Sequence, residues 1–255
     1  MILNKEWRIL TIGDGDLSFS ASLQKHFSPR ALSATVYDSL ETLSEKYNDV
    51  FYQYLQQENI QTLFDFNVCQ ETSWINLEKN SFDLVIFQFP LLPAFRNFDE
   101  YKTQTKNSNI NLLNRRLLRH FLLNSFKYFL DPNGQQLCFI TSKDVKPYQQ
   151  WNIENALNMQ TNIHYLGSMA FDIKKFPGYK IRNVDRDKHV RDTQGETYVW
   201  SLRCTHSIQE QLHKLPYHGA NNCSICRAGP FSTIKDKHVH LQSKKHLQMM
   251  SFERD

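Results

Sequence analysis

The chain has 255 residues, of which 40% are hydrophobic and 22% are charged, and its formal net charge is +4. This length allows one large domain with a buried core and a small second unit. The sequence contains no run of about 18 apolar residues and no basic segment leading into an apolar run at its start, which excludes a membrane-spanning or exported protein. We therefore expect a cytoplasmic monomer.

The cysteines and the charges are unevenly distributed. Five cysteines at irregular spacing do not form a disulfide framework, which indicates a reducing compartment. Residues 1–100 contain 7 Lys/Arg and 14 Asp/Glu, whereas residues 101–130 contain 6 basic residues and no acid; a second basic stretch covers residues 174–191. This asymmetry suits a polyanion docking beside an acidic half that binds a small molecule, although ordinary solvated faces would give the same counts.

Short β-type runs alternate with helical patterns along most of the chain. Strands are predicted at residues 8–13, 31–38, 60–66 and 82–87, and helices at residues 17–27 and 41–57. A long helix over 110–130 follows, then a strand at 136–141, a helix near 148–158, and strands near 161–166 and 197–203. Such alternation predicts an α/β fold, in which helices cover both faces of a largely parallel sheet.

The first predicted strand runs into a glycine turn and then into a helix. Gly13 and Gly15 would let the backbone approach a ligand, and the helix N-terminus would offer free N–H groups. Asp14 and Asp16 flank Gly15 and would repel a pyrophosphate, but they would tolerate the cationic sulfonium and amino group of S-adenosylmethionine. The loop is therefore interpreted as a nucleotide-cofactor loop, with an ordinary tight turn as the alternative.

Two further strand ends carry polar residues. Asp38 ends the second strand, where a carboxylate can accept hydrogen bonds from both ribose hydroxyls of an adenosine, and N-capping of the next helix is its alternative or additional role. The fourth strand ends in Gln88-Phe89-Pro90, where the carboxyl ends of parallel strands line a ligand crevice. We interpret this segment as the place that holds a target nitrogen, with a simple turn as the alternative.

The basic stretches provide candidate RNA contacts. Arg115, Arg116 and Arg119 share one face of the predicted helix over 110–130, apart from its apolar residues. Tyr179 and Arg182 lie in the basic loop that follows residue 174.

The C-terminal residues form a separate pattern after a polar stretch at 205–220, which we interpret as a linker. Two residues separate Cys223 from Cys226, thirteen separate Cys226 from His240, and five separate His240 from His246. Two thiolates on a turn and two imidazoles on one helix satisfy tetrahedral Zn²⁺, so residues 221–255 are interpreted as a small ββα-type Cys2His2 zinc finger. His238 is a competing ligand with poorer spacing. Lys244 and Lys245 favour a phosphate-facing helix, although many such fingers bind protein instead.

Five segments occur together in the order of a known family: 13–20, 37–39 with 46–47, 82–90, 147–148 with 151–153, and 176–182. On these segments the chain resembles the family of the yeast 25S ribosomal RNA uridine-N3 methyltransferase over about residues 7–203, and the C-terminal unit resembles matrin-type and double-stranded-RNA-binding fingers. The resemblance implies a class I methyltransferase domain over 1–204, Rossmann-like with a mostly parallel seven-stranded sheet. It also implies S-adenosylmethionine as donor and a uridine of ribosomal RNA or tRNA as acceptor, with a nucleolar location in a eukaryote.

The resemblance divides the candidate residues into two groups. Those expected to bind the cofactor are Gly13, Asp14, Gly15, Asp38 and Asn67, and those expected at the reaction are Asp16, Gln88, Phe89 and Pro90. The chain departs from the family at Gln88, where the family has Asn, and at 67–69, where the family has Asp-Ala-Thr.

The general base and the function class stay open from sequence. Uridine N3 carries a proton, so either Asp16 or Asp83 acts as a base or positioning alone is enough. Because of the two departures, a non-catalytic RNA- or ribonucleoprotein-binding protein is the alternative to an RNA methyltransferase. A methyltransferase that acts on protein or DNA is the third possible function.

Overall fold

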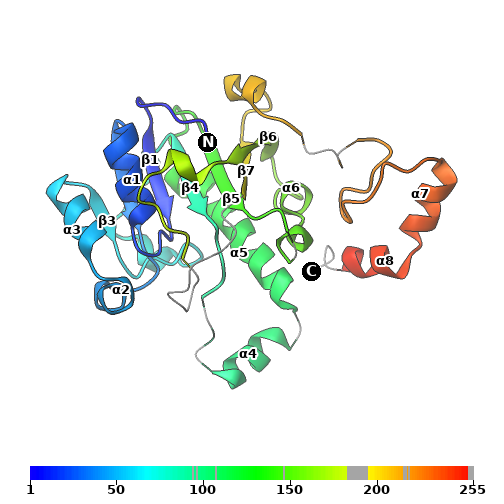
Figure 1. The fold of residues 1–255 in the computed structure, drawn as a ribbon, viewed down its shortest axis with the longest axis horizontal. Helices are drawn as coiled ribbons and strands as arrows, with labels where there is room; N and C mark the ends of the chain where they lie inside the picture. The colour runs from blue at the N-terminus through cyan, green and yellow to red at the C-terminus, as the bar shows by residue number, and fades with distance from the viewer. Residues whose placement is uncertain are drawn as a thin grey trace.

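The computed structural model describes residues 1–93, 95, 97–106, 108–145, 147–182, 195–214, 217 and 219–251, and its centre is a seven-stranded sheet (Figure 1). The strands are β1 (Arg8–Ile12), β2 (Ala31–Thr35), β3 (Gln61–Leu63), β4 (Leu84–Gln88), β5 (Leu137–Ser142), β6 (His164–Phe171) and β7 (Gly195–Ser201). Their order is β3-β2-β1-β4-β5-β7-β6. Neighbouring pairs among β1 to β5 are parallel, and β7 is antiparallel to β5 and β6. The predicted mostly parallel, Rossmann-like sheet of seven strands is confirmed.

Helices connect the strands and lie against both faces of the sheet (Figure 1). The α-helices of this part are α1 (Ser18–Phe27), α2 (Leu40–Tyr47), α3 (Val50–Gln57), α4 (Phe98–Thr105), α5 (Ile110–Asn124) and α6 (Ile153–Ala156). Shorter turns are η1 (Glu71–Trp74), η2 (Ser125–Phe129), η3 (Tyr148–Trp151), η4 (Ile173–Lys175) and η5 (Ser207–Gln211). Within the described residues, no helix is long and apolar enough to span a membrane.

Three helical predictions need correction. The single helix expected over 41–57 is two helices, because Asn48 adopts a φ of +68° after α2, and asparagine tolerates this left-handed conformation better than most residues. The helix expected over 110–130 leaves the α-helical pattern at Asn124 and continues as the π-helical turn η2. Helix α4 was not predicted, because it buries none of its residues and so lacks an apolar periodicity.

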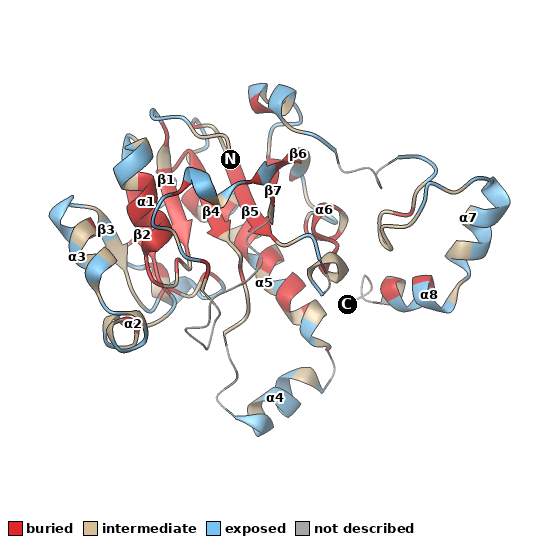
Figure 2. Ribbon diagram, in the orientation of Figure 1, coloured by how far each residue is buried: buried red, intermediate tan, exposed pale blue. Residues whose placement is uncertain are grey.

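Alternate residues of the central strands belong to two separate cores. In β4, Leu84 and Ile86 lie in the same cluster as the apolar residues of α1, whereas Val85 and Phe87 lie in the same cluster as those of α5. This alternation follows from the two-residue period of a strand. Figure 2 shows the sheet and the inner faces of α1 and α5 as the buried part of the molecule. The sheet is therefore rigid, and its carboxyl ends are held in fixed positions.

The stretch at 205–220, which the sequence suggested is a linker, makes contacts with the large domain. Turn η5 buries Ile208, and His213 forms an antiparallel bridge with Ser168 of β6. Tyr217 donates a hydrogen bond from its hydroxyl to Glu154 of α6. Residues 215, 216 and 218 lie outside the described residues. Much of the stretch is therefore attached to the large domain.

The C-terminal unit contains helices α7 (Ile234–Leu241) and α8 (Lys244–Ser251) and one isolated antiparallel bridge, between Cys223 and Ala228. The expectation of two histidines on one helix was wrong, since His240 lies on α7 and His246 on α8. Six residues of a continuous helix would place the two side chains about 120° apart around its axis. The break between the helices removes this separation. Residues 252–255 of the expected finger lie outside the described residues.

Candidate active site

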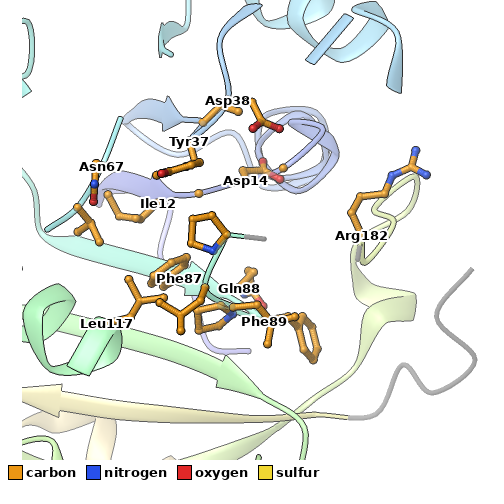
Figure 3. A pocket seen from close by; sticks show the side chains of 18 of the residues that line it. Ile12, Asp14, Tyr37, Asp38, Asn67, Phe87, Gln88, Phe89, Leu117 and Arg182 are labelled. Carbon is orange, nitrogen blue, oxygen red and sulfur yellow. The ribbon is translucent and has the colours of Figure 1, made fainter. Parts of the chain in front are cut away.

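A cavity of about 640 Å³ opens at the carboxyl ends of β1, β2 and β4. This volume is in the range of small-molecule and cofactor sites. Figure 3 shows Asp14, Tyr37 and Asp38 along one side of the cavity, with Gln88 and Phe89 along the other. The segments expected to bind cofactor and to hold the acceptor therefore face a common space.

The two glycines of the loop after β1 have different reasons to be glycine. Gly13 has a φ of +60°, and a Cβ on it would lie 2.9 Å from Cε2 of Phe87, so a side chain there would be both strained and in collision. A Cβ on Gly15 would meet only Arg182 Cβ at 3.8 Å, which is an ordinary contact. The fold itself requires glycine at 13, whereas at 15 the open space belongs to the cavity.

The N-terminus of α1 is capped by the two acidic residues of the loop. The backbone N–H of Ser18 donates to Asp16 Oδ1 at 3.0 Å, and both N–H and Oγ of Ser20 donate to Asp14 Oδ2, at 2.7 and 2.6 Å. The expectation that these N–H groups are free for a ligand was therefore wrong. Carboxylates already satisfy them, which also explains why this loop does not suit a pyrophosphate.

Asp14 is buried beside a second carboxylate. Burial and the charge of Asp16 raise the pKa of Asp14 to about 7, although the hydrogen bonds from Ser20 act in the opposite direction. A cation entering the cavity would favour the ionised form of this carboxyl.

Asp16 and Arg182, which are 166 positions apart, form one ion pair at the cavity. Arg182 Nε donates to Asp16 Oδ2 at 2.7 Å, and its guanidinium lies 5.0 Å from the ring centroid of Tyr47. Lys180 N also donates to Ser18 Oγ at 3.0 Å, which ties the 180–182 segment to the glycine loop. Arg182 was expected to contact RNA, but here it completes the wall of the cavity around Asp16.

The residues expected to touch ribose and adenine also line the cavity. Asp38 follows β2 and accepts a hydrogen bond from Lys46 Nζ at 2.9 Å. Asn67 also lines the cavity, and its Oδ1 accepts from Cys69 N at 2.9 Å. Tyr37 and Tyr47 line the cavity as well, and sequence reasoning assigned them no role although both stand in the family segments.

Gln88 lies at the end of β4, and its side-chain amide is unsatisfied. Neither Oε1 nor Nε2 has a hydrogen-bond partner among the described residues, although both atoms are buried. Because buried polar atoms almost always have partners, an amide left without one beside a cavity is a candidate contact for a ligand. Pro90 lines the same cavity.

Phe89 adopts a strained backbone conformation with a φ of +44°. Its ring packs edge-on against Phe171 with centroids 5.4 Å apart, and a Cβ on Gly195 would lie 3.0 Å from it. A non-glycine residue with positive φ at a ligand site stores strain that the surrounding packing maintains. Tyr179, which also lines the cavity, packs edge-on against the same Phe171 with ring centroids 6.2 Å apart.

Asp83 is not in the cavity, so its candidacy as general base was wrong. It precedes β4 at the opposite end of the sheet, where Arg8 Nε donates to its Oδ2 at 2.8 Å. Burial raises its pKa, but the hydrogen bonds from Arg8 and from Gln135 N outweigh this effect, and the net direction is downward. Asp83 therefore supports the fold.

The three arginines of α5 do not form one exposed basic surface. Arg115 is buried and donates to Gln150 O at 3.0 Å, and Arg119 donates to the carbonyls of Leu157 and Met159, both at 2.8 Å. Arg116 is exposed, and it lines the cavity. Helical spacing places the three residues near one another but does not show which carbonyls lie opposite them.

The four cysteine and histidine residues of the C-terminal unit converge. The ligand atoms of Cys223, Cys226, His240 and His246 all lie within 4.8 Å of one another. His246 Nδ1 lies 3.5 Å from each cysteine Sγ, and the buried Nε2 of His240 has no hydrogen-bond partner among the described residues. This group has the composition and spacing to hold one metal ion. Lys244 and Lys245 are exposed beside it.

Comparison with known proteins shows the family to which the chain belongs. Residues 10–183 match the model of the family described as rRNA (uridine-N3-)-methyltransferase BTM5-like. The chain is 24% identical over 256 residues to the 25S rRNA (uridine(2634)-N(3))-methyltransferase of Saccharomyces cerevisiae, covering 81% of this chain and 76% of that protein. Among solved structures, a methyltransferase from Pyrococcus furiosus superposes with a TM-score of 0.46 and 13% identity, covering 79% of this chain and 77% of that one.

Proposed function

The chain belongs to the rRNA (uridine-N3-)-methyltransferase BTM5-like family and is an S-adenosylmethionine-dependent RNA methyltransferase, and we propose that the cavity described above holds both the methyl donor and the acceptor uracil. We propose N3 of a uridine in ribosomal RNA, or in tRNA, as the acceptor atom. The family match and the uridine-N3 methyltransferase of yeast to which the chain is similar support this assignment.

The residues around the cavity fit S-adenosylmethionine. In this proposal Asp38 binds the ribose hydroxyls of the cofactor, and Asn67 lies on the adenine side. Gly13 and Gly15 have no side chain, so the cofactor can come close to the backbone there. The carboxylate of Asp14 favours a positively charged ligand over a phosphate. When bound, the cofactor supplies a methyl group on a sulfonium, and the protein's part is to place the acceptor in line with it.

The observation that carries the acceptor proposal is the unsatisfied amide of Gln88. Uracil presents acceptors at O2 and O4 and a donor at N3, and an amide presents one acceptor and one donor group in one plane. A flipped-out uracil would accept a hydrogen bond from Gln88 Nε2 at O2 or O4 and would be oriented by it, which leaves N3 free to receive the methyl group. Pro90 and the Phe89 ring, which line the same cavity, would confine the base.

Proton removal from N3 depends on how the base is positioned. Asp16 Oδ2 already accepts a hydrogen bond from Arg182 Nε, so this oxygen is not free to take the N3 proton. We therefore propose that N3 loses its proton to solvent water, that Gln88 Nε2 stabilises the resulting anion by donating to a uracil carbonyl oxygen, and that Asp16 holds the cavity wall in place.

We further propose that the C-terminal group holds structural Zn²⁺. Zinc bonds of about 2.3 Å to sulfur and about 2.0–2.1 Å to nitrogen, in a tetrahedral arrangement, place a sulfur and a nitrogen ligand about 3.5 Å apart. Both cysteine sulfurs lie 3.5 Å from His246 Nδ1, which matches this distance. With zinc bound, the unit would present Lys244 and Lys245 to RNA phosphates.

One observation favours a second role for this unit. Ile234, Val239 and Leu247 are 78%, 62% and 57% exposed, so the surface of α7 and α8 carries apolar side chains next to its lysines. An exposed apolar patch is typical of a protein-binding surface. Docking to a ribosomal protein is therefore the second candidate for the unit.

Parallel assays with labelled S-adenosylmethionine test the proposal. The purified protein should bind the cofactor and transfer the methyl group to RNA from cells that lack this protein, with no transfer to DNA or protein. Cofactor binding without any transfer would instead identify a non-catalytic RNA-binding protein on a methyltransferase fold.

A further inference from the structure

Arg227, the residue next to the proposed metal ligand Cys226, inserts into the large domain. Its side chain is 8% exposed, and its guanidinium forms ion pairs with Asp144 after β5 and with Glu154 of α6, the latter at 3.0 Å. The guanidinium also lies 4.6 Å from the ring centroid of Tyr217. A residue of the small unit thus occupies a built site on the catalytic domain.

Glu154 needs a positively charged partner because its carboxylate is fully buried. Its side chain has no exposed surface, and its carboxylate accepts hydrogen bonds from Arg227 Nη2 and from the Tyr217 hydroxyl. Tyr198 of β7 also accepts from Arg227 Nη2, at 3.3 Å. Removing one partner of a buried ion pair leaves an uncompensated charge, so the catalytic domain is most stable with Arg227 in place.

The site that receives Arg227 is connected to the wall of the cofactor cavity. Arg115 of α5 donates to Gln150 O at 3.0 Å, just before α6, and Arg119 donates to Leu157 O at 2.8 Å, just after it. The same helix α5 lines the cavity with Arg116 and Leu117. Figure 1 shows α6 between α5 and the C-terminal helices.

We propose that Arg227 is a positioning residue that locks the Cys/His unit to the catalytic domain at a fixed distance from the active site. This inference rests on the proposed RNA methyltransferase function. A locked unit would accept only RNA whose phosphate backbone reaches Lys244 and Lys245 while the target uridine lies at Gln88. A freely tethered unit would accept many separations between those two points. Substrate selection would then come from the separation between the two contacts as well as from the base.

Substitution of Arg227 in the full-length, zinc-loaded protein tests the proposal. Arg227→Ala should raise KM for structured RNA roughly tenfold or more, since the second contact is no longer held in place. Its kcat at saturation and its KM for a short fragment carrying only the target uridine should stay within about twofold of wild type. Lys25→Ala, which removes an exposed positive charge on α1, should change neither constant.

A second variant separates positioning from metal loss. Glu154→Gln removes the charge on the catalytic side, far in sequence from the cysteines, and should give the same KM increase with one zinc retained per chain. An unchanged KM in zinc-loaded Glu154→Gln would show that the unit acts as a flexible tether and would overturn the proposal. A fall in kcat on the short fragment would also overturn it.

Hydrogen exchange gives a readout that does not depend on activity. In Arg227→Ala, backbone amides of 150–157 should exchange faster than in wild type, because the buried carboxylate loses its partner. If wild type transfers no methyl group, the proposed function fails. The exchange measurement then tests by itself whether Arg227 locks the Cys/His unit to the large domain. Unchanged exchange in that segment would reject it.

Discussion

Replacing Gln88 with methionine should make the free protein more stable and the enzyme much less active. Both polar atoms of the Gln88 amide are buried without partners among the described residues, and each such atom costs roughly 1–3 kcal/mol. Methionine has a similar length and no strong donor or acceptor. For the two atoms together, the free energy of unfolding should therefore rise by about 2–6 kcal/mol, and each kcal/mol raises Tm by about 2–4 °C for a chain of this size. Methyl transfer should fall roughly 100-fold or more, because the base is no longer oriented.

Scanning calorimetry of ligand-free protein and methyl transfer at saturating RNA measure the two effects. Ser142→Ala is the matched control, since Ser142 Oγ at the end of β5 is also buried without a partner but is not among the described residues that line the cavity. That variant should keep full activity. A lower Tm in Gln88→Met, or wild-type transfer by it, would refute the assignment of Gln88 to the acceptor.

Three further predictions concern the cofactor, the buried acid and the metal. Asp38→Ala should weaken S-adenosylmethionine binding by roughly 1–3 kcal/mol in calorimetric titration, and unchanged affinity would remove Asp38 from the site. The pKa of Asp14 is raised from 3.8 to about 7, so its contribution to stability is lost as the pH rises from 3.8 through 7; denaturant titrations of Asp14→Asn should show a smaller loss over that range, and a loss equal to wild type would contradict the shift. Cys223→Ser should release one zinc per chain by elemental analysis, whereas exposed Cys204→Ser should retain it, and zinc-free wild type would contradict the metal proposal.

Features of the fold and site that depend on a local sequence pattern could be predicted from the sequence. Alternation of apolar runs with helical segments gave the sheet, and strand ends gave the polar residues of the cavity, since parallel strands bring their carboxyl ends to one edge. Gln88 and Asp38 were identified in this way, and the structure places both at the cavity. The Cys and His spacing likewise predicted a cluster that the structure brings together.

What the sequence did not predict are pairings between distant positions. Nothing local indicates that Asp16 meets Arg182 or that Arg227 meets Glu154, because both contacts depend on how distant segments pack against one another. The same limit misplaced Arg115, whose helical spacing suggested an exposed basic face and whose guanidinium instead binds a carbonyl inside the domain. Charge counts show which residues are basic, and packing decides which of them reach solvent.

The most direct test of the central claim is the identity of the nucleoside that receives the methyl group. RNA from cells that lack this protein would be incubated with the enzyme and labelled S-adenosylmethionine, digested, and analysed by nucleoside mass spectrometry. We predict label in 3-methyluridine from ribosomal RNA or tRNA, and its loss with Gln88→Met. Label in another nucleoside, or no label in RNA, would contradict the account.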